Sequence, residues 1–115
     1  MNRKYSLRKS YEIEKLLKLK QSVGNKYYAL YYEITSLKTP KLAFSVSRKF
    51  KTAVKRNYEK RVAKEIFRKH LNLLENLKIL VVIKEPVKNL SFYEKEKQIL
   101  SLIDKILRSK HEKEK

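Results

Sequence analysis

Residues 50–69, which read FKTAVKRNYEKRVAKEIFRK, are the most informative part of the chain. At about 100° per residue, the pattern predicts a helix with two unlike faces. One face carries cations at fourfold spacing with further polar groups beside them: Arg56, Lys60, Lys64 and Arg68, flanked by Asn57 and Arg61. The other face gathers apolar side chains: Val54, Tyr58, Val62, Ala63 and Ile66. We expect Thr52 to be the N-cap and the helix to run to about Leu74.

The cationic face is costly for the protein alone. Like charges four residues apart on a helix repel each other by about a few tenths of a kcal/mol per pair. Glu59 and Glu65 point away from the centre of the row and are expected to relieve it little. The row therefore predicts contact with a polyanion, and a solvated face without a partner is the alternative.

The composition also predicts a polyanionic partner. The chain has 115 residues, with 30 Lys and Arg against 12 Asp and Glu, which gives a formal net charge of +18. Such a charge is typical of proteins that bind nucleic acids or anionic membranes. No apolar run reaches the roughly 18–20 residues of a membrane span, so we expect nucleic acid and no membrane partner. The absence of cysteine and of a signal-peptide core predicts a cytoplasmic location.

The first half of the chain predicts a helix followed by two strands. Ser10 is the expected cap of a short helix that ends at residues 23–25, where Gly24 and Asn25 favour a turn. Residues 26–34 and 41–47 alternate as strands do. The sides expected to face helices carry Tyr28, Leu30, Tyr32 and Ile34 in the first strand and Leu42, Phe44 and Val46 in the second. The opposite sides carry small and hydroxyl-bearing residues and are expected to stay open.

The second half predicts one more strand and one more helix. Residues 78–84 hold a continuous apolar run, the pattern of a central strand covered on both sides. Ser91 and Glu94 form a capping box, and the helix after it buries one stripe: Ile99, Leu100, Ile103, Ile106 and Leu107. Residues 111–115 are expected to be a frayed tail. The order α-β-β-α-β-α predicts a single α+β domain over residues 1–115, a sandwich of one mixed sheet against helices.

The residues that could carry chemistry do not form an active site in the sequence. His70 and His111 lack metal-ligand spacing, and Gly24 alone cannot build a phosphate-binding loop. Ser45 and Ser47 have no candidate base near them in the sequence. We therefore expect no catalytic residue, no protein-bound metal and no small-molecule substrate, and instead a binding surface.

That surface has two predicted parts. The cationic helix face suits phosphates, because Arg and Lys neutralise them and release counterions. On the open sheet face, Tyr27 and Tyr31 could stack on unpaired bases, and Ser45 or Ser47 could hydrogen-bond them. Arg48 and Lys49 follow the second strand directly. Cross-strand packing is the alternative for both tyrosines, nearly as good for Tyr27 and weaker for Tyr31.

The combination of motifs resembles the bacterial ribonuclease P protein family. The resemblance rests on residues 44–49 (FSVSRK), residues 53–61 (AVKRNYEKR), Phe67, the opening residues 7–9 (LRK) and residues 84–86 (KEP). It covers nearly the whole chain. It implies a left-handed β-α-β crossover, an exception to the usual right-handed rule.

The resemblance also implies roles for residues. The helix would contact the catalytic RNA through Arg56, Asn57, Lys60, Arg61, Lys64 and Arg68, with Arg48 and Lys49 nearby. A cleft would hold the 5′ leader of precursor tRNA between Ile13, Leu17, Tyr31, Ser45, Ser47 and Lys49. The implied function is the protein subunit of ribonuclease P, an endoribonuclease whose RNA subunit performs the hydrolysis with bound magnesium. The expected partners are therefore ribonuclease P RNA and precursor tRNA.

Four positions depart from the family pattern. Lys51 stands where a Gly is usual, so a differently built turn into the helix is expected. Tyr58 stands where an Arg is usual, and its place near the apolar side predicts packing rather than RNA contact. Ile13 and Leu17 stand where aromatic residues are common, so they would stack on bases less well.

Two alternative functions remain at this point: a ribosomal or ribosome-assembly protein that uses the same helix on RNA, and a DNA-binding regulator.

Overall fold

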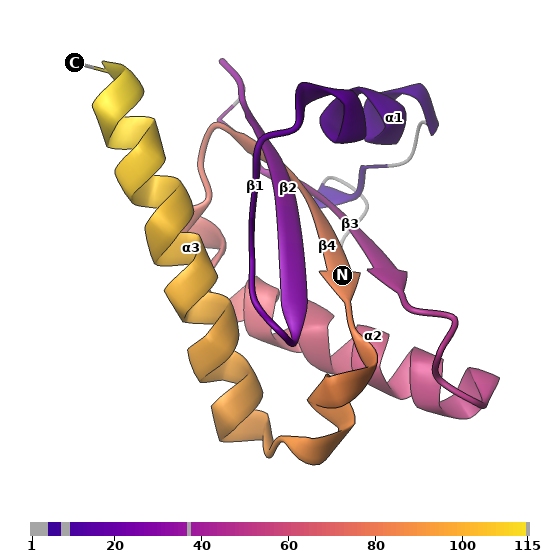
Figure 1. Ribbon diagram of the computed structural model, residues 1–115. Helices are drawn as coiled ribbons and strands as arrows, with labels where there is room; N and C mark the ends of the chain where they lie inside the picture. The colour runs from indigo at the N-terminus through magenta and orange to yellow at the C-terminus, as the bar shows by residue number, and fades with distance from the viewer. Residues whose placement is uncertain (1–4, 8–9, 37, 115) are drawn as a thin grey trace.

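The sheet is built around strand β4, Leu77–Ile83, in the order β1-β2-β4-β3 (Figure 1). In this computed structural model, residues 5–7, 10–36 and 38–114 are described. The neighbouring strands are β1 (Ser22–Gly24), β2 (Tyr28–Ile34) and β3 (Lys41–Val46). β4 pairs antiparallel with β2 and parallel with β3, and β1 pairs antiparallel with β2. The predicted mixed sheet is confirmed.

β4 is the most deeply buried strand because helices cover both of its faces. Leu77, Ile79, Val81 and Ile83 belong to the main core, and Leu80 points to the other side, against Leu7 and Leu16. A strand covered on two sides must be apolar on both. The continuous apolar run therefore identified the central strand correctly.

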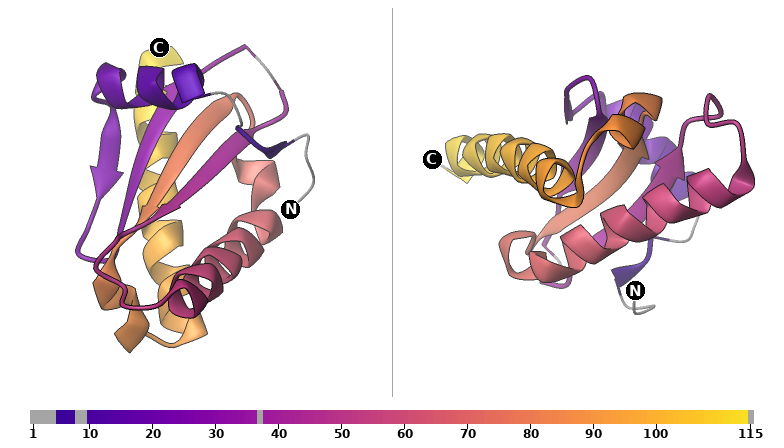
Figure 2. Two further views of the ribbon diagram at one scale, coloured as in Figure 1. Left: turned by 90° about the vertical axis from the view of Figure 1, so that its right-hand side faces the viewer. Right: turned by 90° about the horizontal axis from the view of Figure 1, so that it is seen from below.

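The three helices divide between the two faces of the sheet (Figures 1 and 2). α2 (Ala53–Lys69) and α3 (Phe92–Glu114) bury their apolar stripes on one face, and α1 (Ser10–Leu19) lies on the other. The stripe of α3 differs slightly from the prediction: Leu102 is fully buried, while Leu100 and Leu107 are only partly so. Among the described residues, no helix is both long and apolar enough to cross a membrane.

The predicted caps of α2 and α3 are present. Thr52 caps α2 by accepting a hydrogen bond from the Lys55 backbone N–H at 3.2 Å. In the capping box of α3, the Ser91 N–H donates to Glu94 Oε1 at 3.0 Å, and the Glu94 N–H donates to Ser91 Oγ at 3.2 Å. The far ends differ from the prediction. α2 ends at Lys69, before the short 3-10 helix Leu71–Leu73, and α3 continues to Glu114.

Strand β1 was not predicted. α1 ends at Leu19, and the next residue, Lys20, takes a positive φ of 56°. The prediction that residues 23–25 end this helix is therefore wrong. Their turn chemistry serves the β1–β2 hairpin instead. Asn25 Oδ1 accepts hydrogen bonds from the backbone N–H groups of Tyr27 and Tyr28, at 2.8 and 2.9 Å.

The unit β3–α2–β4 is the parallel crossover of the fold. The left-handedness that the resemblance implies for it stays a prediction. Arg8 and Lys9 of the opening motif and the capping side chain of Ser10 lie outside the part of the chain that is described.

Candidate nucleic-acid interface

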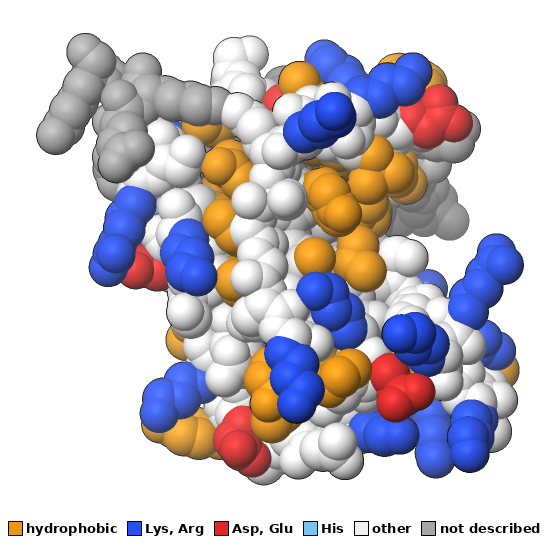
Figure 3. All heavy atoms as spheres, in the orientation of Figure 1, with side chains coloured by type: hydrophobic (Ala, Val, Ile, Leu, Met, Phe, Trp, Pro, Cys, Tyr) orange, Lys and Arg blue, Asp and Glu red, His pale blue; other side chains and the backbone are white. Residues whose placement is uncertain are grey.

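The predicted cations of α2 share one flank of that helix. Val62, Ala63, Ile66 and Phe67 are buried against the sheet and fix the rotation of the helix. The polar flank consists of exposed Asn57, Arg61 and Arg68 and half-buried Arg56, Lys60 and Lys64. Figure 3 shows basic side chains gathered over α2. We call these six residues the cationic flank.

The cationic flank lies against strand β3. The Lys64 ammonium is 5.9 Å from the centroid of the Phe44 ring, and Phe44 packs edge-to-face on Phe67 with centroids 5.7 Å apart. A shallow depression lies among Arg61, Lys64, Glu65 and Arg68. Arg68 donates a hydrogen bond to Glu65 at 2.8 Å, and because both side chains are exposed this pair relieves the row only at its end.

The predicted apolar side of α2 is wrong at its first turns. Val54 is 78% exposed and Tyr58 is 55% exposed, so Tyr58 does not pack in the core as expected. Figure 1 shows these turns reaching beyond the strands. Glu59 instead takes a buried position, paired with Lys95 of α3. A helix wheel gives the direction of each side chain around the helix axis. It does not show which side of each turn is covered by the sheet or by α3.

The opposite face of the sheet is covered by α1 at one end only. Leu16 is fully buried there with Leu7 and Leu80. Two ion pairs join the helix to the strands: Lys15 to Glu33 at 3.3 Å, and Glu12 to Lys78 at 3.5 Å. α1 is therefore fixed over the end of the sheet where β2 finishes and β3 and β4 begin.

Beyond α1 this face consists of small side chains. Cross-strand pairing brings Gly24, Ala29, Val82 and Ser45 into one row across all four strands. Gly24 and Ser45 are exposed, and Ala29 and Val82 are half-buried. In Figure 3 hydrophobic side chains are visible beneath α1, over the strands. We call this row, with Tyr31, the open sheet face.

The predicted cleft residues lie on the open sheet face or beside it. Leu17 on α1 is 44% exposed, whereas Ile13 and Tyr31 are half-buried against the Leu16–Leu80 cluster. Ser45 is exposed on β3, and Ser47 follows the strand. The structure therefore brings these five residues to one side of the sheet. Tyr27 packs against the main core instead, which favours the packing alternative for that residue.

The loop after β3 connects the two surfaces. Arg48 and Lys49 are exposed, and the Lys49 N–H donates to Ser47 Oγ at 3.2 Å. Phe50 is only 3% exposed and anchors the loop to the core. This loop enters α2 directly, so the open sheet face and the cationic flank adjoin the same strand, β3.

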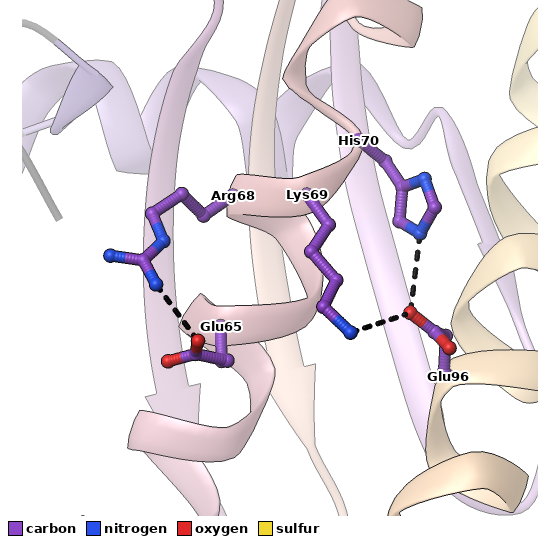
Figure 4. A network of polar contacts seen from close by, with 5 residues as sticks. All are labelled: Glu65, Arg68, Lys69, His70 and Glu96. Atoms are coloured by element: carbon purple, nitrogen blue, oxygen red, sulfur yellow. Dashed lines mark hydrogen bonds and ion pairs between the residues drawn. The ribbon is translucent and has the colours of Figure 1, made fainter.

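Of the two histidines, His70 has a structural partner, and the side chain of His111 lies outside the part of the chain that is described. His70 ends α2, and its Nε2 lies 3.3 Å from Glu96 Oε2, which also pairs with Lys69 at 3.7 Å (Figure 4). His70 is thus a boundary residue between α2 and α3. In the described ranges, no three His, Cys, Asp or Glu side chains gather as metal ligands would. Within these ranges the donor set therefore does not fit a magnesium site built from three protein side chains.

Known proteins share both the sequence and the fold. The family described as Ribonuclease P matches residues 1–107. The chain is 34% identical over 117 residues to the ribonuclease P protein component of Mycoplasmopsis pulmonis, with 100% of both chains covered. It is 30% identical over 110 residues to that of Mycoplasma mobile, with 96% of both covered.

A solved structure agrees. The RNase P protein of Staphylococcus aureus has a TM-score of 0.79 at 25% identity, over 87% of this chain and 93% of that one. The RNase P protein of Thermotoga maritima shares the fold, with a TM-score of 0.79 at 24% identity over 87% and 96%. The chain therefore belongs to the ribonuclease P protein family.

Proposed function

We propose that this chain is the protein subunit of a ribonuclease P holoenzyme and promotes 5′ maturation of tRNA. In this proposal the cationic flank binds the catalytic RNA, and the open sheet face with α1 binds the 5′ leader of precursor tRNA. The observation that carries it is the common border at β3. One strand separates a surface suited to phosphates from a surface suited to an unpaired chain.

The cationic flank matches a structured RNA. Arg56, Arg61 and Arg68 can each donate two parallel hydrogen bonds to phosphate oxygens, which a Lys cannot do. Each neutralised phosphate releases counterions, so affinity is expected to fall as salt rises. Asn57 adds one donor and one acceptor to this flank. These contacts position an RNA with little reading of its sequence.

The open sheet face matches a single strand. Small side chains at Ala29 and Ser45 let a nucleotide chain approach the strands, and the half-exposed Tyr31 ring offers a surface for an unpaired base. Ser45 and Ser47 supply hydroxyl groups for hydrogen bonds. A leader is unpaired, so its bases are free to stack.

Phosphodiester hydrolysis is assigned to the RNA subunit with its bound magnesium ions. The protein supplies binding, since cations that screen two phosphate-rich strands let substrate and magnesium bind more readily between them. No protein side chain is given a catalytic role. We place the complex in the cytoplasm, without a membrane partner.

The test is cleavage of precursor tRNA by the matching RNA at low magnesium, with and without this protein. We expect the protein to lower the magnesium requirement and to raise the affinity for leader-bearing substrate. If the magnesium requirement and the affinity both stay unchanged, the proposal is wrong.

A ribosomal role is the alternative. It would be favoured if the protein co-sedimented with ribosomal subunits and showed no preference for precursor over mature tRNA.

A further inference from the structure

A hollow of about 560 Å³ lies on the flank of α2 away from the cationic flank. It is bounded by the first turns of α2 and by the 3-10 helix Glu85–Asn89. Its volume falls within the roughly 300–1,000 Å³ typical of pockets for small organic groups. None of the RNA-binding or leader-binding positions assigned above lines it.

The lining combines apolar, aromatic and cationic groups. Phe50 and Glu59 are buried within it, at 3% and 5% exposed, while Val54 and Tyr58 stand out into solvent. Lys55 and Lys88 add two cations, of which Lys88 is paired with Glu85 of the same 3-10 helix at 3.2 Å. Among the described lining residues the only acid is Glu59, whose charge is balanced by Lys95 at 2.9 Å.

The Tyr58 ring is held from inside the protein. Lys95 Nζ lies over the ring, 5.2 Å from its centroid, and Glu59 fixes Lys95. A cation on one side of an aromatic ring stabilises its position. The ring is still 55% exposed, so it forms a preformed platform at the edge of the hollow.

We propose that the hollow binds one unpaired nucleotide of the RNA subunit, a contact that rests on the proposed function. The base stacks on Tyr58 beside Val54, and the neighbouring phosphates lie near Lys55 and Lys88. The charge of the lining selects this occupant, since the exposed Lys55 ammonium beside an aromatic ring suits an anion that carries a flat base. An unpaired nucleotide is required, because pairing in a duplex hides the face that would stack.

The experiment measures affinity for the matching ribonuclease P RNA over a series of salt concentrations. Tyr58→Ala should weaken binding by about fivefold to 150-fold and leave the salt slope unchanged, since it removes stacking and no charge. Tyr58→Phe, which keeps the ring, should bind like the wild type. Tyr93→Ala is the matched control, because Tyr93 is also exposed (67%) but lies on α3 outside the hollow.

Three outcomes separate the possible failures. In the first, the wild type binds the RNA and the double variant Arg56→Ala with Arg61→Ala binds more weakly, but Tyr58→Ala binds like the wild type. The hollow is then not an RNA site, and the proposed function stands. If the wild type does not bind the RNA, the proposed function itself fails. If Tyr58→Ala alters self-association of the protein but not its affinity for the RNA, the hollow is a contact between copies of the chain. That result would overturn the proposal. Thermal melting of each variant monitors the fold.

Discussion

Glu59 of α2 and Lys95 of α3 form an ion pair inside the protein, with Glu59 Oε1 2.9 Å from Lys95 Nζ. The side chains are 5% and 4% exposed, and Nζ also donates a hydrogen bond to Glu59 Oε2 at 3.2 Å. Burial raises the pKa of the nearby Tyr28 phenol above its ordinary value, and the negative charge of Glu59 adds to that rise. The pair links α2, which carries the cationic flank, to α3.

Lys95→Met should lower the free energy of unfolding by about 3–5 kcal/mol, because it leaves the Glu59 carboxylate buried without its partner. Urea unfolding at neutral pH measures the change. Replacing both residues, Glu59→Leu with Lys95→Met, should recover most of the loss, since no buried charge then remains. Lys97→Met, at an exposed position of the same helix, is the control. Equal stability of Lys95→Met and Lys97→Met would show that the pair contributes nothing.

Arg56→Ala with Arg61→Ala should weaken binding to the RNA subunit and flatten its salt dependence. The slope of log affinity against log salt should fall by about 0.7–0.9 for each phosphate that the protein no longer neutralises. Filter binding at several salt concentrations measures it. Lys105→Ala with Arg108→Ala removes the same charge from exposed positions of α3 and should change the slope much less. An equal change in both double variants would mean that net charge, not the cationic flank, determines affinity.

Tyr31→Ala should reduce the preference of the holoenzyme for leader-bearing tRNA by about 1–3 kcal/mol, the range for removal of one base stack. The measurement compares affinities for precursor and mature tRNA. Because Tyr31 is half-buried against the Leu16–Leu80 cluster, the melting temperature of the variant must be followed in parallel. Equal losses of affinity for precursor and mature tRNA would refute the leader site on the open sheet face.

Glu94→Gln should destabilise the protein at neutral pH but not in acid. The pKa of Glu94 is lowered in the folded protein, chiefly because the Ser91 backbone N–H donates a hydrogen bond to the carboxylate, and further through the Ser91 side chain. A lowered folded pKa means that the stabilisation is present above the ordinary value of 4.5 and is lost as pH falls through the folded pKa. Melting temperatures of wild type and variant should therefore converge in acid. A constant gap across the pH range would contradict this.

The elements that the sequence predicted correctly have local causes. The apolar run of β4 and the helix caps at Thr52 and Ser91 depend on residues within a few positions of one another. The six residues of the cationic flank follow from helical periodicity alone. Such patterns determine which way a side chain points around its own element.

The features that the sequence missed depend on distant residues. Glu59 is buried because Lys95, 36 positions later, meets it across the two helices. Tyr58 is exposed because α2 turns its neighbour Glu59, rather than Tyr58, toward Lys95 of α3. β1 has only three residues, one of them a glycine, and is too short to show alternation in the sequence. It forms because its backbone pairs with the edge of β2. Arrangement in space, not local preference, decides all three.

The leader site on the open sheet face is tested by the ratio of affinities for leader-bearing and mature tRNA, measured with the RNA subunit alone and with the protein added. We expect the protein to raise this ratio, because the open sheet face binds only the leader. Tyr31→Ala should lower the ratio, whereas Arg56→Ala with Arg61→Ala should act mainly by weakening assembly. A ratio that the protein leaves unchanged, under conditions where it is bound to the RNA subunit, would refute the leader site.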